Sequence, residues 1–237
     1  MALLEICIDT IAGAQLAAAA NVARLEVCAA LDLGGLTPSA GLMQACAKLP
    51  VQNYAMIRPR AGHFRYDSSE LDVICADIRM AQACGMDGVV LGALTPDNTL
   101  DLPALRQMLA AAGPMKATLH RAFDLTPDAA DALEQAIDLG FERILTSGQQ
   151  VNALQGVCLL KTLVDQAEAR ITIMPGCGVR AENVAEILRT SGANEAHSSC
   201  AKTRHTQVDH LGFENAKGQQ VTDKTLVEKM LSVLKTL

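Results

Sequence analysis

Short apolar segments alternate along the whole chain with longer segments in which apolar residues recur every three to four positions. The short segments have the length of strands and the longer ones the periodicity of helices. The predicted strands are residues 3–8, 24–28, 51–57, 88–92, 115–120, 143–146, 170–174 and 194–198, and the predicted helices are residues 11–20, 39–48, 69–84, 102–112, 128–139, 152–167, 180–190 and 222–237. Eight such pairs predict an α/β protein with a closed parallel (β/α)8 barrel of the TIM type, in one domain over residues 1–237. No Gly-x-Gly-x-x-Gly motif opens any helix, which argues against an open dinucleotide-binding sheet.

Residues 199–221 break the alternation. They are polar and follow neither the strand nor the helix period, so we expect an irregular segment before the last helix. In a compact domain, a loop of this length is typical of a lid, an arm that contacts a partner, or a disordered stretch.

The formal net charge of −6 over 237 residues argues against nucleic acid or an anionic membrane as a partner. The N-terminal segment has no basic region, and no run of about 18 apolar residues is present, so we expect no signal peptide, no membrane span and a cytoplasmic location. Eight scattered cysteines without a Cys-x-x-Cys pair fit reduced, buried thiols.

Two adjacent predicted strands carry the same Glu-x-Cys pattern. In the first strand the apolar residues alternate with Glu5 and Cys7, and in the second they alternate with Glu26 and Cys28. The apolar residues must face the helices, so these four side chains should point into the barrel. Neighbouring strands lie about 4.8 Å apart, so two carboxylates and two thiols should cluster there.

Buried carboxylates are costly unless cations pair with them. Arg58 and Arg60, which follow the third strand, and Arg121, which follows the fifth, are the expected partners. Glu5 and Glu26 are therefore open to two interpretations: a salt-bridge layer inside the barrel, or a site that holds a ligand.

A polar rim follows the fifth predicted strand, where the carboxyl ends of parallel strands collect catalytic groups. It contains His120, Arg121 and Asp124, and His197 should belong to the same rim. In an enzyme, His120 would act as general acid/base with a pKa near neutrality, Glu5 or Glu26 as the second acid/base, and Asp124 as an orienting group. The three arginines named above would neutralise an anion.

Glycine- and serine-rich turns follow the last three predicted strands. Such turns present backbone amides to an anion at helix N-termini, and barrel enzymes often bind phosphate there. The candidate ligand-binding residues are Ser147, Gly148, Gly176, Gly178, His197 and Ser198. Ordinary tight connections between strands and helices are the alternative.

Seven motifs together resemble the CutC family, over residues 3 to about 199. They are Leu4-Glu5-Ile6-Cys7, Leu25-Glu26-Val27-Cys28, Gly34-Gly35-Leu36-Thr37-Pro38-Ser39, Ile57-Arg58-Pro59-Arg60, His120-Arg121-Ala122-Phe123-Asp124, Leu145-Thr146-Ser147-Gly148 and Glu195-Ala196-His197-Ser198-Ser199. The resemblance implies a TIM-type barrel, a cytoplasmic protein, a homodimer and a role in copper homeostasis with Cu(I) as the ligand.

Two hypotheses follow. By the resemblance, Cys7 and Cys28 match the positions proposed to bind copper, and soft thiolates suit Cu(I); Ile8 and Asp9 stand where some members carry a second cysteine and a polar residue. The arginines, histidines and carboxylates of the rim instead fit a lyase, isomerase or hydrolase that acts on a small anionic substrate, phosphorylated ones included. A hard divalent ion on the carboxylates and histidines would also fit, and no motif for an organic cofactor is found. The sequence does not decide whether the protein is an enzyme.

Overall fold

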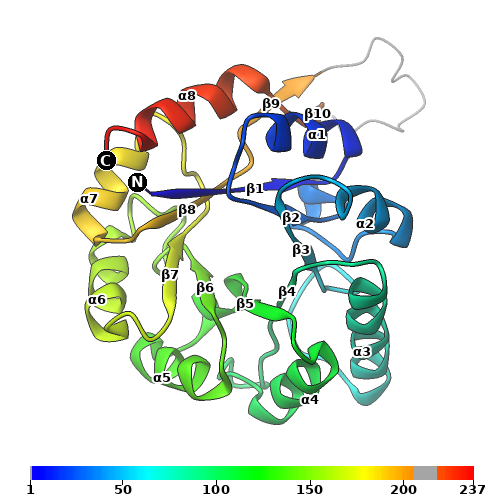
Figure 1. Cartoon of the computed structure of the whole chain (residues 1–237). Coiled ribbons are helices and arrows are strands. Elements are labelled where there is room, and N and C mark those ends of the chain that lie inside the picture. The colour runs from blue at the N-terminus through cyan, green and yellow to red at the C-terminus, as the bar shows by residue number, and fades with distance from the viewer. Residues whose placement is uncertain (1, 205–217) are drawn as a thin grey trace.

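The computed structural model describes residues 2–204 and 218–237, and eight of its strands form one parallel sheet that curves into a barrel with helices around it (Figure 1). The barrel strands are β1 (Leu3–Ile8), β2 (Arg24–Val27), β3 (Gln52–Met56), β4 (Gly88–Leu91), β5 (Lys116–Leu119), β6 (Arg143–Thr146), β7 (Thr172–Pro175) and β8 (Glu195–Ser198). They are hydrogen-bonded in the order β7-β6-β5-β4-β3-β2-β1-β8, and β7 contacts β8 to complete the ring. The predicted (β/α)8 barrel is confirmed.

The helices lie outside the ring of strands. They are α1 (Ile11–Ala19), α2 (Ala40–Cys46), α3 (Ser68–Ala83), α4 (Leu102–Ala112), α5 (Ala129–Leu139), α6 (Val157–Ala167), α7 (Val184–Ser191) and α8 (Lys224–Leu234), with short 3-10 turns η1 (Leu31–Leu33) and η2 (Arg121–Leu125). Side-chain caps start several of them; Asp67 and Glu70 form a reciprocal capping box at α3. Helices α6 and α7 begin several residues later than predicted, because turns precede them. No helix among the described residues is long and apolar enough to cross a membrane.

The core lies between the strands and the helices. Ile6 and Ile8 of β1, and Leu25 and Val27 of β2, are fully buried on the side that faces the helices. The alternate positions of these strands therefore point into the barrel, as the alternation of the sequence predicted.

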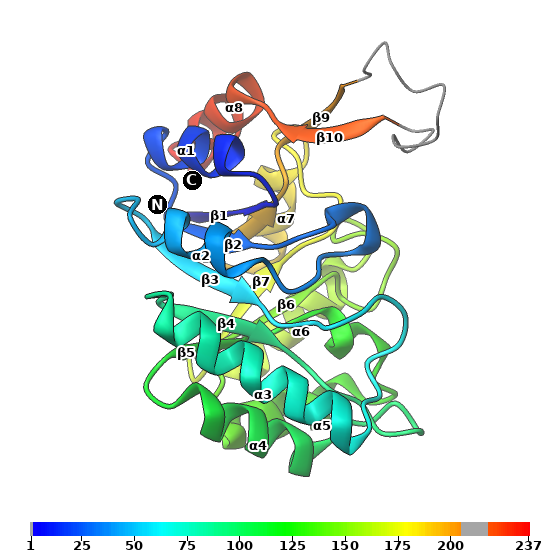
Figure 2. The ribbon, with the colours of Figure 1, turned by 90° about the vertical axis from the view of Figure 1, so that its right-hand side faces the viewer.

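The irregular segment predicted over residues 199–221 is in part regular. Strands β9 (Ala201–Arg204) and β10 (Gln219–Thr222) pair antiparallel, with Gln219 opposite Arg204 and Thr222 opposite Ala201. This ribbon projects beside α1 and α8 (Figure 2), and Thr222 packs close to Gly13 of α1. The sequence did not indicate these strands because both are mostly polar and neither contains a fully buried residue, so no buried face imposes an alternation. The rest of that segment, residues 205–217, lies outside the described residues.

Candidate functional site

A layer of paired charges fills the inside of the barrel. Glu5 accepts a hydrogen bond from Arg24 Nε, and Arg24 Nη2 also donates to Glu195 Oε2 at 2.6 Å. Arg143 Nε donates to the same Glu195 oxygen at 2.6 Å. All four side chains are buried. Glu5 therefore belongs to a salt-bridge layer inside the barrel, and its cation is Arg24 rather than one of the predicted arginines.

The alternation of inward and outward positions also predicts that Arg24 and Glu195, which were not named as site residues, point into the barrel. Arg24 lies two positions before Glu26 and so shares its inward face, and Glu195 stands in the same relation to His197. Arg58, Arg60 and Arg121, the cations expected for Glu5 and Glu26, form no ion pair with either in the part of the chain that the structure describes. These arginines lie beyond the strand ends, where the period of two no longer fixes direction.

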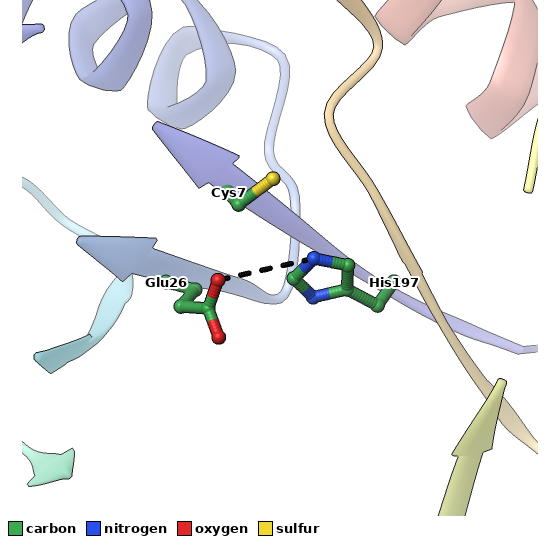
Figure 3. Close-up of side chains that lie close together, drawn as sticks. All are labelled: Cys7, Glu26 and His197. Carbon is green, nitrogen blue, oxygen red and sulfur yellow. Dashed lines mark ion pairs between the residues drawn. The ribbon is translucent and has the colours of Figure 1, made fainter. Parts of the chain in front are cut away.

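His197 of β8 is held between two carboxylates. Its Nδ1 lies 2.7 Å from Glu5 Oε1. Its Nε2 lies 3.9 Å from Glu26 Oε2, the pair that is dashed in Figure 3. Burial opposes a charge on this ring, but electrostatic interactions with Cys7 and Glu26 and hydrogen bonds to Cys7 and Glu5 raise the pKa of His197 well above its ordinary value. The ring is therefore fixed in orientation, with Nε2 directed to the Cys7–Glu26 side.

Three different ligand atoms meet at this point. One atom each from Cys7 (Sγ), Glu26 (a carboxylate oxygen) and His197 (a ring nitrogen) lie within 4.8 Å of one another, and all three residues are buried (Figure 3). Burial raises the pKa of Glu26, so a cation bound beside it would offset the cost of ionising this carboxylate. We call these three residues the Cys7–Glu26–His197 cluster.

Cys28, the second predicted metal ligand, lies beside the cluster and outside it. Its Sγ is 3.4 Å from Glu26 Oε2 and donates to that oxygen. Burial first, and the negative charge of Glu26 second, raise the pKa of the Cys28 thiol well above its usual range. In the metal-free protein this sulfur is therefore a protonated donor.

A cavity of about 1010 Å³ opens above the cluster at the carboxyl ends of the strands. Its lining includes all three cluster residues together with Arg58 and His120. The volume is that of a site for a small organic molecule, far more than one ion needs.

Relatives of known family align with most of the length of this chain. The CutC family model matches residues 2–202. The chain belongs to the CutC family. A family protein CutC from Agrobacterium fabrum is 46% identical over 98% of this chain and 94% of its own length. A human protein named copper homeostasis protein cutC homolog is 40% identical over 99% of this chain and 90% of its own length.

Solved structures agree with this membership. The crystal structure of CutC from Streptococcus agalactiae superposes with a TM-score of 0.81 at 35% identity, over 84% of this chain and 99% of that one. Thiamine phosphate pyrophosphorylase from Pyrococcus furiosus superposes with a TM-score of 0.63 at 12% identity, over 99% and 96% of the two chains. At that identity the likeness shows the barrel fold alone, so it carries no reaction over to this CutC-family chain.

His120 does not have the pKa near neutrality that was expected of it. Burial and the charge of Arg58 lower the pKa of His120 to about 3. Its Nδ1 accepts a hydrogen bond from the Ala122 N–H at 3.2 Å, and this bond caps the N-terminus of η2. At neutral pH the ring is therefore uncharged; its role as a general acid/base remains a prediction.

Asp124 lies under the loop that follows β6 and does not line the cavity in the described part of the chain. Its carboxylate accepts hydrogen bonds from Thr146 Oγ1, the Ser147 N–H at 3.1 Å and the Gln149 N–H at 3.2 Å, and pairs with Arg121 at 2.7 Å. These contacts tie η2 to the end of β6.

The remaining predicted residues divide between the cavity and its surroundings. Arg121, Gly178 and Ser198 line the cavity with the cluster. Gly148 packs against the backbone of Gly156. Three other predicted site residues lie outside the cavity lining. Arg60 pairs with Glu70, Ser147 donates a hydrogen bond to Asp124, and Gly176 packs on Leu145. Phosphate binding at these turns remains a prediction.

Proposed function

We propose that this protein binds Cu(I) at the Cys7–Glu26–His197 cluster and serves copper homeostasis. The name of the human relative supports the biological role. The observation that carries the metal site is that a sulfur, a nitrogen and an oxygen ligand atom from three strands lie within 4.8 Å of one another, buried at the barrel mouth.

The donor chemistry suits a soft or borderline ion. A thiolate selects Cu(I) or Zn(II), and an imidazole is a good ligand for either. Glu5 holds Nδ1 of His197 at 2.7 Å, so Nε2 is the ring nitrogen that would bind the ion, and the ion would displace the Nε2 proton to solvent. A carboxylate that orients a metal-binding histidine in this way is a recurrent feature of metal sites.

Cys28 would become a ligand only if Glu26 moved away from the ion. Its sulfur already contacts the Glu26 oxygen, so a small movement of Glu26 would let Cys28 Sγ take that oxygen's place. Cu(I) would favour this exchange because it prefers sulfur to oxygen, whereas Zn(II) accepts the carboxylate.

A competition titration tests the proposal. Reduced, metal-free protein is titrated with Cu(I) against a chromophoric chelator, and Zn(II) is titrated in parallel. We expect one Cu(I) per chain, an affinity at least tenfold lower in Cys7→Ser and His197→Gln, and no change in the control Cys158→Ser, whose thiol is exposed on α6. Unchanged stoichiometry and affinity in Cys7→Ser would contradict the site.

We further propose that the protein is a cytoplasmic homodimer. The support is the family membership and the pattern of free cysteines, which suits a reducing compartment. Light scattering after size exclusion should give twice the chain mass of 25.0 kDa, and cell fractionation should recover the protein with cytosolic markers. A single-chain mass would overturn the dimer.

A further inference from the structure

Arg58 is a buried cation without a carboxylate partner among the described residues. Only 7% of it is exposed, and its guanidinium donates to three backbone carbonyls: Leu33 and Gly35 through Nη1, and Gly62 through Nη2. Its Nε has no hydrogen-bond partner. A buried arginine normally pairs with an anion, because carbonyl dipoles do not neutralise its charge. Arg58 therefore retains its positive charge, and its Nε–H is free.

His120 supplies a second free donor. The Ala122 N–H donates to Nδ1, so in the neutral ring the proton is on Nε2. That Nε2 is buried and has no hydrogen-bond partner. His120 is 3% exposed, and Gly92 makes room for it, since a Cβ there would lie 2.6 Å from His120 Cε1. An unsatisfied buried donor destabilises the fold, and a ligand acceptor would remove that cost.

Phe64 contacts both Arg58 and His120, and we call these three side chains the Arg58–His120 wall. Its ring centroid lies 4.7 Å from that of His120, and the Arg58 Cζ lies 4.9 Å from the same Phe64 centroid. All three side chains line the cavity that the Cys7–Glu26–His197 cluster also lines. The cavity lining thus contains one positive charge and two residues that each keep a buried N–H without a partner, and its volume is more than an ion alone would fill.

We infer that the Arg58–His120 wall binds the carboxylate of a small organic acid, whose remaining atoms extend into the cavity towards the Cys7–Glu26–His197 cluster. A carboxylate has two oxygens and can accept from more than one N–H group. Its single negative charge matches the single charge of Arg58, because His120 is neutral. A phosphate dianion would carry a second charge into a cavity that also contains Glu26. The inference stands apart from copper, since neither donor belongs to the cluster.

Matched ligands test the chemistry. Reduced, metal-free protein is exposed to pyruvate, lactate, succinate and benzoate, to the corresponding amides, and to inorganic phosphate; melting temperature and ligand-observed NMR are recorded. We expect at least one acid to raise the melting temperature and bind at least tenfold more tightly than its amide. Equal binding of acids and amides, no binding of any acid, or binding of phosphate alone would overturn the assignment.

Matched variants locate the subsite. His120→Asn keeps an acceptor for the Ala122 N–H but loses the donor at the Nε2 position, whereas the longer His120→Gln restores an N–H there. We expect carboxylate binding to fall at least tenfold in Arg58→Gln and His120→Asn, and to stay within about threefold of the native value in His120→Gln. The control is Arg65→Gln, an exposed arginine of the same loop that donates to Asn98.

A measurement on the native protein guards against variants that do not fold. The Nε2–H of His120 should give a slowly exchanging NMR signal that moves downfield when the acid binds, and the same shift should occur in Cys7→Ser. Acid binding that leaves this signal unmoved would overturn the inference. If the native protein bound an acid but no copper, only the copper proposal would be contradicted. If it bound copper but no acid, only the present inference would be contradicted.

Discussion

Glu5 connects the salt-bridge layer to the metal cluster. One of its oxygens pairs with Arg24 and the other with His197 Nδ1. Burial alone would raise the pKa of this carboxyl, but His197 and Arg24 outweigh it and lower the pKa of Glu5 to about 2. Glu5 is therefore ionised at any pH at which the protein is handled.

Replacing Glu5 by glutamine should destabilise the fold. The change keeps the shape but leaves Arg24 with one of its two carboxylate partners among the described residues, Glu195, and breaking a buried pair typically costs about 3–5 kcal/mol. Urea denaturation measures the loss. The control Glu134→Gln removes an exposed pair with Arg170 and should cost about 1 kcal/mol or less. Equal losses in the two variants would contradict the role of the buried layer.

His120 should make stability depend on pH. Its pKa is about 3 in the folded chain and about 6.5 when unfolded. Between these values the unfolded chain binds a proton that the folded chain does not, so stability falls as pH decreases from 6.5 towards 3. His120→Asn should remove up to about 1.4 kcal/mol per pH unit from that slope. Parallel slopes from pH 6.5 to 5, measured by denaturant unfolding, would contradict the low pKa.

At the residue scale, the sequence predicted direction inside strands better than beyond them. The alternation in β1 and β2 placed Glu5, Cys7 and Glu26 inside the barrel, and His197 on the same rim, and the structure brings them together. Arg58 follows a strand end, and its position depends on a glycine-rich loop whose carbonyls surround it. Contacts of that kind depend on tertiary packing, so the periodicity of the sequence does not predict them.

At the scale of elements, Asp124 fastens two connections to each other. It lies in η2 and accepts from the backbone of Ser147 and Gln149 after β6. The position of Asp124 after β5 predicted that it belongs to the rim. The turn of η2 instead directs its carboxylate to the loop that follows β6. Short turns reverse direction within a few residues, which strand alternation cannot describe.

Asp124→Ala should therefore loosen the loop that follows β6. It removes the acceptor for Ser147 N–H and Gln149 N–H and the partner of Arg121, and hydrogen bonds to a charged group contribute about 1.5–3 kcal/mol each. We expect a loss of about 2–4 kcal/mol in urea unfolding, and a smaller loss in Asp124→Asn, which keeps one acceptor oxygen. A loss below about 0.5 kcal/mol in Asp124→Ala would contradict the fastening role.

At the scale of the whole molecule, the repeated strand–helix pattern was sufficient to predict the barrel. Each repeat buries its apolar face only against its neighbours, so eight repeats close on one another. The closure is not uniform: within residues 2–204 and 218–237, β7 pairs only with β6 and β8 only with β1, whereas the inner strands of the order pair on both sides. The seam between β7 and β8 therefore lacks a hydrogen-bonded ladder.

Hydrogen exchange should reveal this seam. Backbone amides of β7 and β8 should exchange faster than those of β3 and β4, because local opening needs fewer backbone hydrogen bonds to break. Mass spectrometry of peptides that cover each strand measures the rates. Slower exchange at β7 and β8 than at β3 and β4 would mean that the seam is closed by interactions stronger than a ladder.

X-ray absorption at the copper edge tests the central claim most directly, since it reports the atoms bound to the ion. For reduced protein loaded with one Cu(I), we predict a first shell with sulfur and imidazole nitrogen together, the nitrogen lost in His197→Gln and the Cys7 sulfur lost in Cys7→Ser. A shell of sulfur alone that is unchanged in His197→Gln, or one unchanged in Cys7→Ser, would contradict binding at the Cys7–Glu26–His197 cluster.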